Sequence, residues 1–135
     1  MPDKTRILFA IGSMAGGGAE RQTINYLRYL DRSRFTPLLY LHYRSGELLS
    51  EVPPEVPVIS FWDRHRPPRV YLPGRVRRMQ VRDLATVLEE EKIDVLCSVT
   101  FLLSLVASGA VRRRATPWLA VEMADPRLDF ANQTH

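Results

Sequence analysis

The sequence predicts an α/β fold: a doubly wound, mostly parallel sheet of about five strands flanked by helices. Three observations predict it. Short runs of branched apolar residues alternate with longer segments whose apolar residues recur every three or four positions. The first apolar run ends at a glycine-rich loop that leads directly into a helical pattern. The links between elements are short, as in chains built from right-handed β-α-β crossovers.

Five segments have the length and composition of buried strands. Each is a short run rich in branched and aromatic apolar residues, as in a sheet covered on both faces. They are RILFAIG (6–12), FTPLLYLHY (35–43), VPVISF (56–61), IDVLCSV (93–99) and WLAVE (118–122). Parallel sheets of this kind bind ligands at the carboxyl ends of their strands, so we expect the functional residues there. These ends are residues 16–18, 42–46, 98–100 and 122–127.

Helical segments connect these strands. Apolar residues at helical spacing predict helices over 19–31, about 75–91 and 101–114. A short helix is expected between 45 and 55, interrupted by Pro53 and Pro54. Residues 63–74 (DRHRPPRVYLPG) are proline-rich and basic, which predicts an exposed loop.

Length and composition indicate one globular domain. With 135 residues, 45% of them apolar, the chain can form a real core. No stretch approaches the ~20 apolar residues of a membrane span and no signal-peptide core is seen, so a cytoplasmic location is expected. The single Cys97 lies in an apolar run and is expected to be a buried thiol. There is no disulfide framework and no cluster with metal-ligand spacing.

The net charge of +4 is carried almost entirely by arginine. The planar guanidinium donates two parallel hydrogen bonds to phosphate or carboxylate, which favours an anionic partner. Genome composition alone would give the same excess.

Gly16, Gly17 and Gly18 lie where the first strand gives way to the first helix. Backbone N–H groups of such a loop can approach an anion closely, and the helix dipole adds partial positive charge. The phosphate loop of ATPases would need lysine at position 18, and a dinucleotide fingerprint would need glycine in place of Arg21, so both are excluded. The loop is either a site for a diphosphate or another anion, or simply a tight turn.

A family resemblance covers nearly the whole chain. The stretch ILFAIGSMAGGGAERQTINYLRYLDRSRF, with its GGGAER loop, resembles the start of retaining GT-B glycosyltransferases of family 4 (group 1). SGELLSEVPPEVPVISF, IDVLCSVTFLLSLVA and PWLAVEMADPR are similar to later segments of that family. The chain departs from the family at Ser104, where relatives carry asparagine, and over 121–126, where two polar positions are lost.

The resemblance implies that residues 1–135 correspond to the N-terminal, acceptor-side domain, with the donor-binding C-terminal domain outside this sequence. The complete protein would transfer a sugar from a nucleotide-sugar to a polysaccharide, lipid-linked or other acceptor, retaining its anomeric configuration, in cell-envelope polysaccharide biosynthesis. The present chain alone would be inactive or nearly so. No metal or other cofactor is implied.

The resemblance also suggests roles for particular residues, although it names no catalytic one. The three glycines would contact the donor diphosphate. Residues expected to line the acceptor side or the cleft are Glu20, Arg21, His42, Ser98, Thr100, Glu122, Asp125 and Arg127. For Glu20 and Arg21 the alternative is an exposed first helical turn. His42 and His65 are candidate general bases because an imidazole titrates near neutral pH, and the alternative for each is a packed or solvated imidazole.

Arg75, Arg78 and Arg82 lie opposite the apolar face of the second predicted helix, and no acidic residue stands one turn from Arg78 or Arg82. This stripe predicts peripheral contact with an anionic membrane surface, or else a solvated charged face.

A competing hypothesis is a basic Rossmann-like binding module for an anionic ligand or nucleic acid, without catalysis. Aromatic residues are scarcely interleaved with the arginines and no nucleic-acid motif is present, so no nucleic acid is expected. A half-domain without any catalysis is a third possibility.

Overall fold

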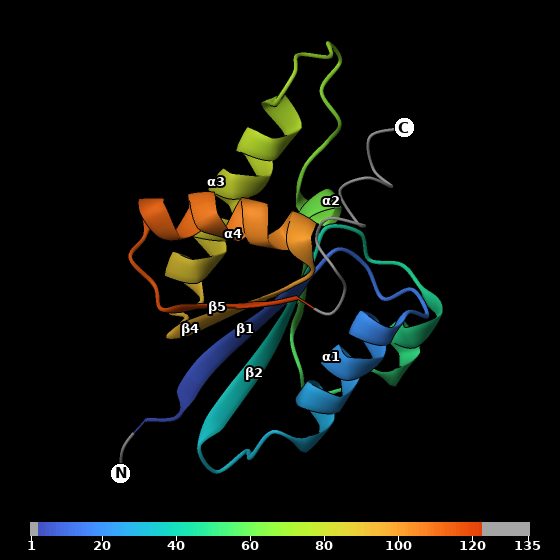
Figure 1. The fold of residues 1–135 in the computed structure, drawn as a ribbon, viewed down its shortest axis with the longest axis vertical. Helices are drawn as coiled ribbons and strands as arrows, with labels where there is room; N and C mark the ends of the chain where they lie inside the picture. Colours follow the sequence, from blue (N-terminus) through green and yellow to red (C-terminus); the bar gives the residue numbers. More distant parts are fainter. Residues whose placement is uncertain (1–2, 123–135) are drawn as a thin grey trace.

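Five strands build one parallel sheet, which confirms the predicted fold class. The structure, a computed structural model, describes residues 3–122 of the 135. The strands are β1 (Thr5–Ile11), β2 (Phe35–Leu41), β3 (Val58–Ser60), β4 (Val95–Val99) and β5 (Trp118–Val121). Their order in the sheet is β3-β2-β1-β4-β5, and every neighbouring pair is parallel (Figure 1).

Three long helices connect the strands as predicted: α1 (Gly18–Tyr29), α3 (Arg75–Glu90) and α4 (Phe101–Arg113). The short helix expected between 45 and 55 is a five-residue 3-10 helix, η1 (Glu47–Glu51). A four-residue helix, α2 (Phe61–Arg64), occupies the end of the third predicted strand and the start of the predicted loop. Phe61 is fully buried, so the chain turns inward there and β3 ends at Ser60.

The two faces of the sheet carry separate cores. Alternate residues of β1 point to opposite faces because a strand has a period of two residues. Leu8 and Ala10 pack in the cluster that includes α3 and α4, whereas Phe9 and Ile11 pack in the cluster that includes α1 and η1. Figure 1 shows the helices in these two layers. Both faces are therefore covered, as a fully parallel sheet requires.

The strand order determines where a ligand can bind. The connection through α1 leads from β1 to β2 on one side, and the connection through α3 leads from β3 across to β4 on the other. The order reverses between β1 and β4, and ligands bind at the carboxyl ends of the strands at such a switch point. Those ends are Ile11 and Val99.

Candidate functional site

The glycine loop leads from the carboxyl end of β1 into α1. Gly16, Gly17 and Gly18 are all exposed, and Gly17 is the N-cap of α1. The Gly17 N–H donates to Ala15 O at 3.0 Å, and Gly17 O accepts the Arg21 N–H at 3.0 Å, which begins the helical ladder. The loop therefore ends in a helix N-terminus at the switch point of the sheet.

The loop after β2 interlocks with the glycine loop. The Met14 N–H donates to Ser45 O at 2.9 Å, and Met14 O accepts the Leu48 N–H at 2.9 Å. Gly46, between these bonds, has φ +113°, and a Cβ built on it would stand 2.1 Å from the carbonyl carbon of Met14. Only glycine permits both this conformation and this close approach.

Glu20 and Arg21, predicted for the cleft, have local neighbours. A Cβ built on Gly17 would stand 2.4 Å from Glu20 Oε2, so the Glu20 carboxylate folds back over the start of its own helix. Arg21 Nη1 lies 2.9 Å from Glu51 Oε1 on η1. The two charged residues that follow the glycines thus contact α1 and η1.

His42 follows β2 and is packed inside the protein. Its ring is 8% exposed and meets the rings of Tyr40 and Phe61 edge-on, with centroids 6.0 Å away in each case. Burial lowers the pKa of His42 from 6.5 to about 4. Within the described residues, Nε2 has no hydrogen-bond partner. His42 is therefore a neutral, packed imidazole near neutral pH, which was the alternative to a cleft residue.

A chain of hydrogen bonds joins the carboxyl ends of β4 and β5. The Trp118 Nε1–H donates to Ser98 Oγ at 2.8 Å, and Ser98 Oγ lies 3.0 Å from Ser104 Oγ. Ser104 Oγ lies 3.1 Å from Glu122 Oε1 and 3.1 Å from Thr100 O. The structure thus brings together three of the residues predicted for the cleft: Ser98, Thr100 and Glu122.

The direction of this chain follows from its protons. An indole N–H only donates and an ionised carboxylate only accepts. Ser98 therefore accepts from Trp118 and has one proton left for Ser104, whose own proton goes to Glu122 or to the Thr100 carbonyl. The bond to the ionised acceptor is the stronger one. The part played by Trp118 was not predicted from the sequence. Ser98 could have indicated such a contact, because a hydroxyl group buried in an apolar strand needs a hydrogen-bond partner.

Thr100 turns the chain sharply after β4. Its φ of 87° lies in the left-handed region that residues with side chains rarely adopt, and such strain costs about 1–3 kcal/mol. Thr100 is the N-cap of α4, and its N–H donates to Val121 O at 3.1 Å. The strained turn therefore lies at the switch point and is held there by β5.

Asp83 is a buried carboxylate that joins β2, α2 and α3. The Tyr40 hydroxyl donates to Oδ2 at 2.7 Å, while His65 Nε2 and Arg64 Nη1 lie 2.8 and 3.5 Å from Oδ1. Burial and the adjacent carboxylate raise the pKa of Tyr40. This cluster was not predicted from the sequence, although Asp83 stands one helical turn before Val87 on the apolar face. Through this contact His65 anchors α2 to α3.

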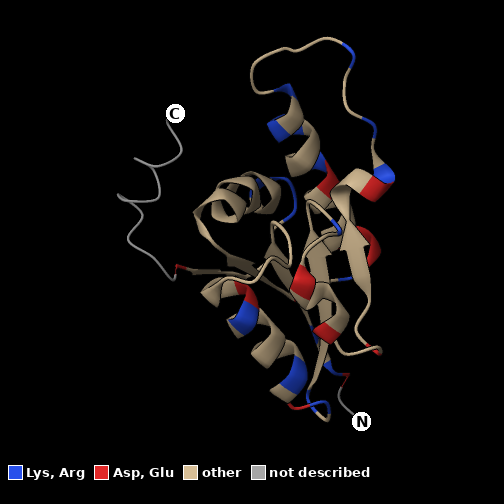
Figure 2. Ribbon diagram, turned by 90° about the vertical axis from the view of Figure 1, so that its right-hand side faces the viewer, with Lys and Arg blue, Asp and Glu red and all other residues tan. Residues whose placement is uncertain are grey.

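A strongly basic segment projects beyond the sheet. Figure 1 shows the loop before α3, with the first turns of α3, extending away from the other elements, and Figure 2 shows basic positions along both. Between residues 64 and 82 the sequence holds no acidic residue and seven arginines: Arg64, Arg66, Arg69, Arg75, Arg77, Arg78 and Arg82. The loop also exposes apolar side chains, with Val70, Tyr71 and Leu72 at 61%, 83% and 50%.

The predicted arginine stripe is free of ion pairs. Arg75, Arg78 and Arg82 have no acidic partner within 4.0 Å among residues 3–122. Together with Leu72 and Met79 they line a surface cavity of about 430 Å³. In the same part of the chain, no helix is both long and apolar enough to cross a bilayer.

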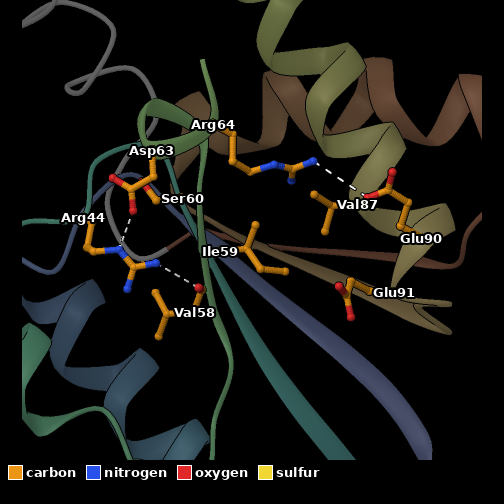
Figure 3. Close-up of a pocket in the computed structure, with 9 residues that line it drawn as sticks. All are labelled: Arg44, Val58, Ile59, Ser60, Asp63, Arg64, Val87, Glu90 and Glu91. Carbon is orange, nitrogen blue, oxygen red and sulfur yellow. Dashed lines mark hydrogen bonds and ion pairs between the residues drawn. The ribbon is translucent and has the colours of Figure 1, made fainter. Parts of the chain in front are cut away.

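Another cavity, of about 360 Å³, lies along the open edge of β3 (Figure 3). Its charged side chains are already paired. Arg44 donates one hydrogen bond to the Asp63 carboxylate and another, of 3.0 Å, to the Val58 carbonyl oxygen. Arg64 forms an ion pair with Glu90 at 3.9 Å. Because this cavity is away from the switch point and its charges have partners, we assign it no ligand.

Three further predictions concern Asp125 and Arg127, metal binding and Cys97. Asp125 and Arg127 lie outside the described residues. Within 3–122, no three His, Cys, Asp or Glu side chains converge closely enough to hold a metal ion. Cys97 is 6% exposed and burial raises its pKa to about 11, which confirms a buried, protonated thiol.

Comparison with known proteins places the fold. No family model and no curated protein matches the chain. A glycosyltransferase from Rickettsia africae ESF-5 gives a TM-score of 0.66 at 17% identity, over 98% of this chain and 35% of that one. The lipopolysaccharide outer core galactosyltransferase WaaB gives a TM-score of 0.64 at 15% sequence identity, and the match covers 87% of this chain and 32% of that one. Anabaena Alr3699/HepE, solved with UDP and glucose, gives a TM-score of 0.58 at 23% sequence identity, and the match covers 84% of this chain and 28% of that one.

The chain thus has the Rossmann-like fold of one half of a GT-B glycosyltransferase. It spans about a third of the length of these solved structures. At such low identities the likeness establishes the fold, and the reaction has to be argued from the site.

Proposed function

We propose that the chain is the acceptor-side, N-terminal domain of a retaining, hexose-transferring glycosyltransferase of family 4 (group 1). The complete protein would transfer a sugar from a nucleotide-sugar to a polysaccharide, lipid-linked or other acceptor in cell-envelope polysaccharide biosynthesis. The observation that carries the proposal is the exposed glycine loop at the switch point of a sheet with this topology. The presence of UDP in the Anabaena structure of the same fold supports a nucleotide donor.

The chemical role of the loop is to stabilise the leaving diphosphate. Breaking the bond between sugar and nucleotide leaves negative charge on phosphate oxygens. Backbone N–H groups of Gly16, Gly17 and Gly18 can donate to those oxygens, and the N-terminus of α1 contributes its dipole. These donors need no metal ion, and the proposal includes none.

The acceptor side of the site would include the cluster at the ends of β4 and β5. Thr100 provides a hydroxyl, and Glu122 is exposed and provides a carboxylate that accepts hydrogen bonds. Ser98 is buried and would support this surface through its hydrogen bond with Ser104. Sugar hydroxyl groups are donors that a carboxylate binds well. Asp125 and Arg127, which follow Glu122 in the sequence and lie outside the described residues, stay predicted acceptor residues.

The projecting basic segment would hold the enzyme against a membrane. Unpaired Arg75, Arg78 and Arg82 suit the phosphates of anionic lipids, and Val70, Tyr71 and Leu72 are apolar side chains exposed close by. Charge and apolar contact together are typical of proteins that bind at the surface of a bilayer. This supports a peripheral location at the inner face of the membrane.

The decisive experiment is calorimetric titration with UDP- and GDP-sugars of this chain and of a version extended through the downstream reading frame. Gly18→Ala provides the variant, because nothing lies within 4 Å of a Cβ at this position and the fold should be unaffected. Alanine keeps the backbone N–H, but its methyl group would stand in the open space where the diphosphate has to approach. Donor binding by the extended protein, weakened at least tenfold in Gly18→Ala, would therefore support the diphosphate role of the loop. Unchanged thermal unfolding would show that the variant is folded.

The competing binding module predicts a different result. Its basis is the run of seven arginines without acidic residues between positions 64 and 82. If the extended protein binds no nucleotide-sugar, and the chain instead binds nucleic acid with an affinity that falls steeply with salt, the glycosyltransferase proposal is wrong.

A further inference from the structure

One of the chain's own carboxylates lies against the first glycine of the glycine loop. Glu47 is the first residue of η1, and its side chain lies against Gly16. A Cβ built on Gly16 would stand 1.8 Å from Glu47 Oε1 and 3.0 Å from Glu47 Cδ. The carboxylate therefore fills the space in which a side chain at position 16 would otherwise lie.

The backbone next to Glu47 is fixed to the glycine loop. The hydrogen bonds of Met14 with Ser45 and Leu48 bracket residues 46 and 47, and Leu48 is buried. The tight approach of Gly46 to Met14 holds the same segment from the other side. The point of attachment of the Glu47 side chain is therefore fixed, while the exposed side chain can still rotate about its own bonds.

The Glu47 carboxylate has no cationic partner in the part of the chain that the structure describes. Among residues 3–122 no Lys, Arg or His lies within ion-pair distance of its carboxylate. Arg21 and Arg28, the nearby cations of α1, lie 2.9 and 3.7 Å from Glu51 instead. Gly16 precedes Gly17, the N-cap of α1, so the Glu47 carboxylate lies near the N-terminus of that helix. The dipole of α1 stabilises an unpaired negative charge there, as it would stabilise an anionic ligand.

We propose that Glu47 is an internal anion that lies over Gly16 and sets the affinity of the glycine loop for the diphosphate of a nucleotide. This inference rests on the proposed function, in which the same loop contacts the donor. The diphosphate and the Glu47 carboxylate are both negative and need the same space beside Gly16. The ligand therefore binds after the Glu47 side chain rotates outward, and the loop is shielded from other anions in the meantime.

The test is calorimetric titration with UDP of the version extended through the downstream reading frame, at low and at high salt. Glu47→Gln keeps the shape of the side chain and removes its charge. We expect it to bind UDP about fivefold more tightly than the wild type, because it lacks the repulsion of like charges a few ångströms apart. The gain should shrink at high salt. Glu47→Ala removes shape as well as charge and should bind UDP at least as tightly.

Glu55→Gln is the matched control. It makes the same change in net charge, but Glu55 is paired with Arg32 at 3.2 Å and lies beyond the end of η1. Its affinity for UDP should equal that of the wild type. If the wild type binds UDP and Glu47→Gln binds it no more tightly, the inference is wrong and the proposed function stands. If the wild type and all variants bind neither UDP nor GDP, the proposed function fails and the inference fails with it.

Discussion

The Tyr40 hydroxyl donates a 2.7 Å hydrogen bond to Asp83 Oδ2 and so joins β2 to α3 inside the protein. Both residues are buried, so Tyr40→Phe leaves a carboxylate oxygen without this donor. We expect a loss of about 1–3 kcal/mol in the free energy of unfolding, measured with urea. Tyr43→Phe, at a position 56% exposed, is the control and should change it by less than about 0.5 kcal/mol. Equal effects of the two substitutions would contradict this account.

Burial of His42 predicts a pH dependence of stability. Its pKa is about 4 in the folded chain and 6.5 in the reference state. Between these values the unfolded chain binds a proton that the folded chain does not, so stability falls as the pH decreases from about 6.5 toward about 4. The contribution is about 3 kcal/mol in total. Chemical unfolding at several pH values should show this loss in the wild type and a smaller one in His42→Gln. Identical pH profiles would exclude His42 as the cause.

Gly46→Ala should destabilise the site more than any other glycine substitution near it. The positive φ of Gly46 and the 2.1 Å approach to Met14 leave no room for a methyl group, and we expect a loss of at least about 2 kcal/mol. Gly18→Ala, in the first turn of α1 with open space around it, should unfold at the wild-type temperature or slightly above. Thermal unfolding of both variants checks the contrast, and a similar loss in both would contradict it.

The hydrogen-bond chain from Trp118 to Glu122 predicts coupling between its two ends. Trp118→Phe removes the donor that polarises the Ser98 hydroxyl and so weakens the bond that Ser98 donates to Ser104. The effects of Trp118→Phe and Ser104→Ala on unfolding should therefore not add. A double-mutant cycle should give a coupling energy of about 0.5–1 kcal/mol. Ser108→Ala is the control on α4, because Ser108 bonds to Leu105 O and lies outside the chain. Additive effects in the first pair would argue against a connected chain.

The arginine stripe predicts selective binding to anionic vesicles. Replacing Arg75, Arg78 and Arg82 by glutamine should weaken sedimentation with phosphatidylserine-containing vesicles by about 100-fold, at about 1 kcal/mol for each charge near the surface. The matched control replaces Lys4, Arg34 and Lys92, which precede β1, β2 and β4 at the opposite edge of the sheet. If both triple variants lose the same affinity, total charge is responsible and the stripe has no special role.

Local patterns predict the elements of this fold well. All five strands and three long helices lie where apolar runs and helical spacing place them, because burial on both faces of a parallel sheet leaves a clear pattern. The helix α2 was missed since four residues are too few to show a period. The strand ending at residue 43 was predicted too long, because the His42 and Tyr43 N–H groups bond to Gly12 O, in the loop after β1.

The site was predicted less completely, because its contacts join residues far apart in the sequence. The grouping of Ser98, Thr100 and Glu122 followed from the rule for carboxyl ends of strands. The position of Glu47 over Gly16 did not, since it depends on the interlocking of two loops. Asp83 was missed because a single acidic residue on an apolar helix face gives no indication of its partners on β2 and α2.

The central position of β1 has a consequence for the growing polypeptide. β1 is made first, pairs with β2 some 30 residues later (Thr5 with Phe35) and with β4 some 88 residues later (Ile7 with Val95). On the ribosome, β1, β2 and β3 can assemble once residue 60 has been made, whereas β4 is complete only at residue 99. At the usual rate of about 5–20 residues per second, the interval lasts roughly 2–8 seconds. During that time an apolar edge of the future centre of the sheet is open to wrong partners, so this is the interval in which a nascent chain of this topology most needs a chaperone.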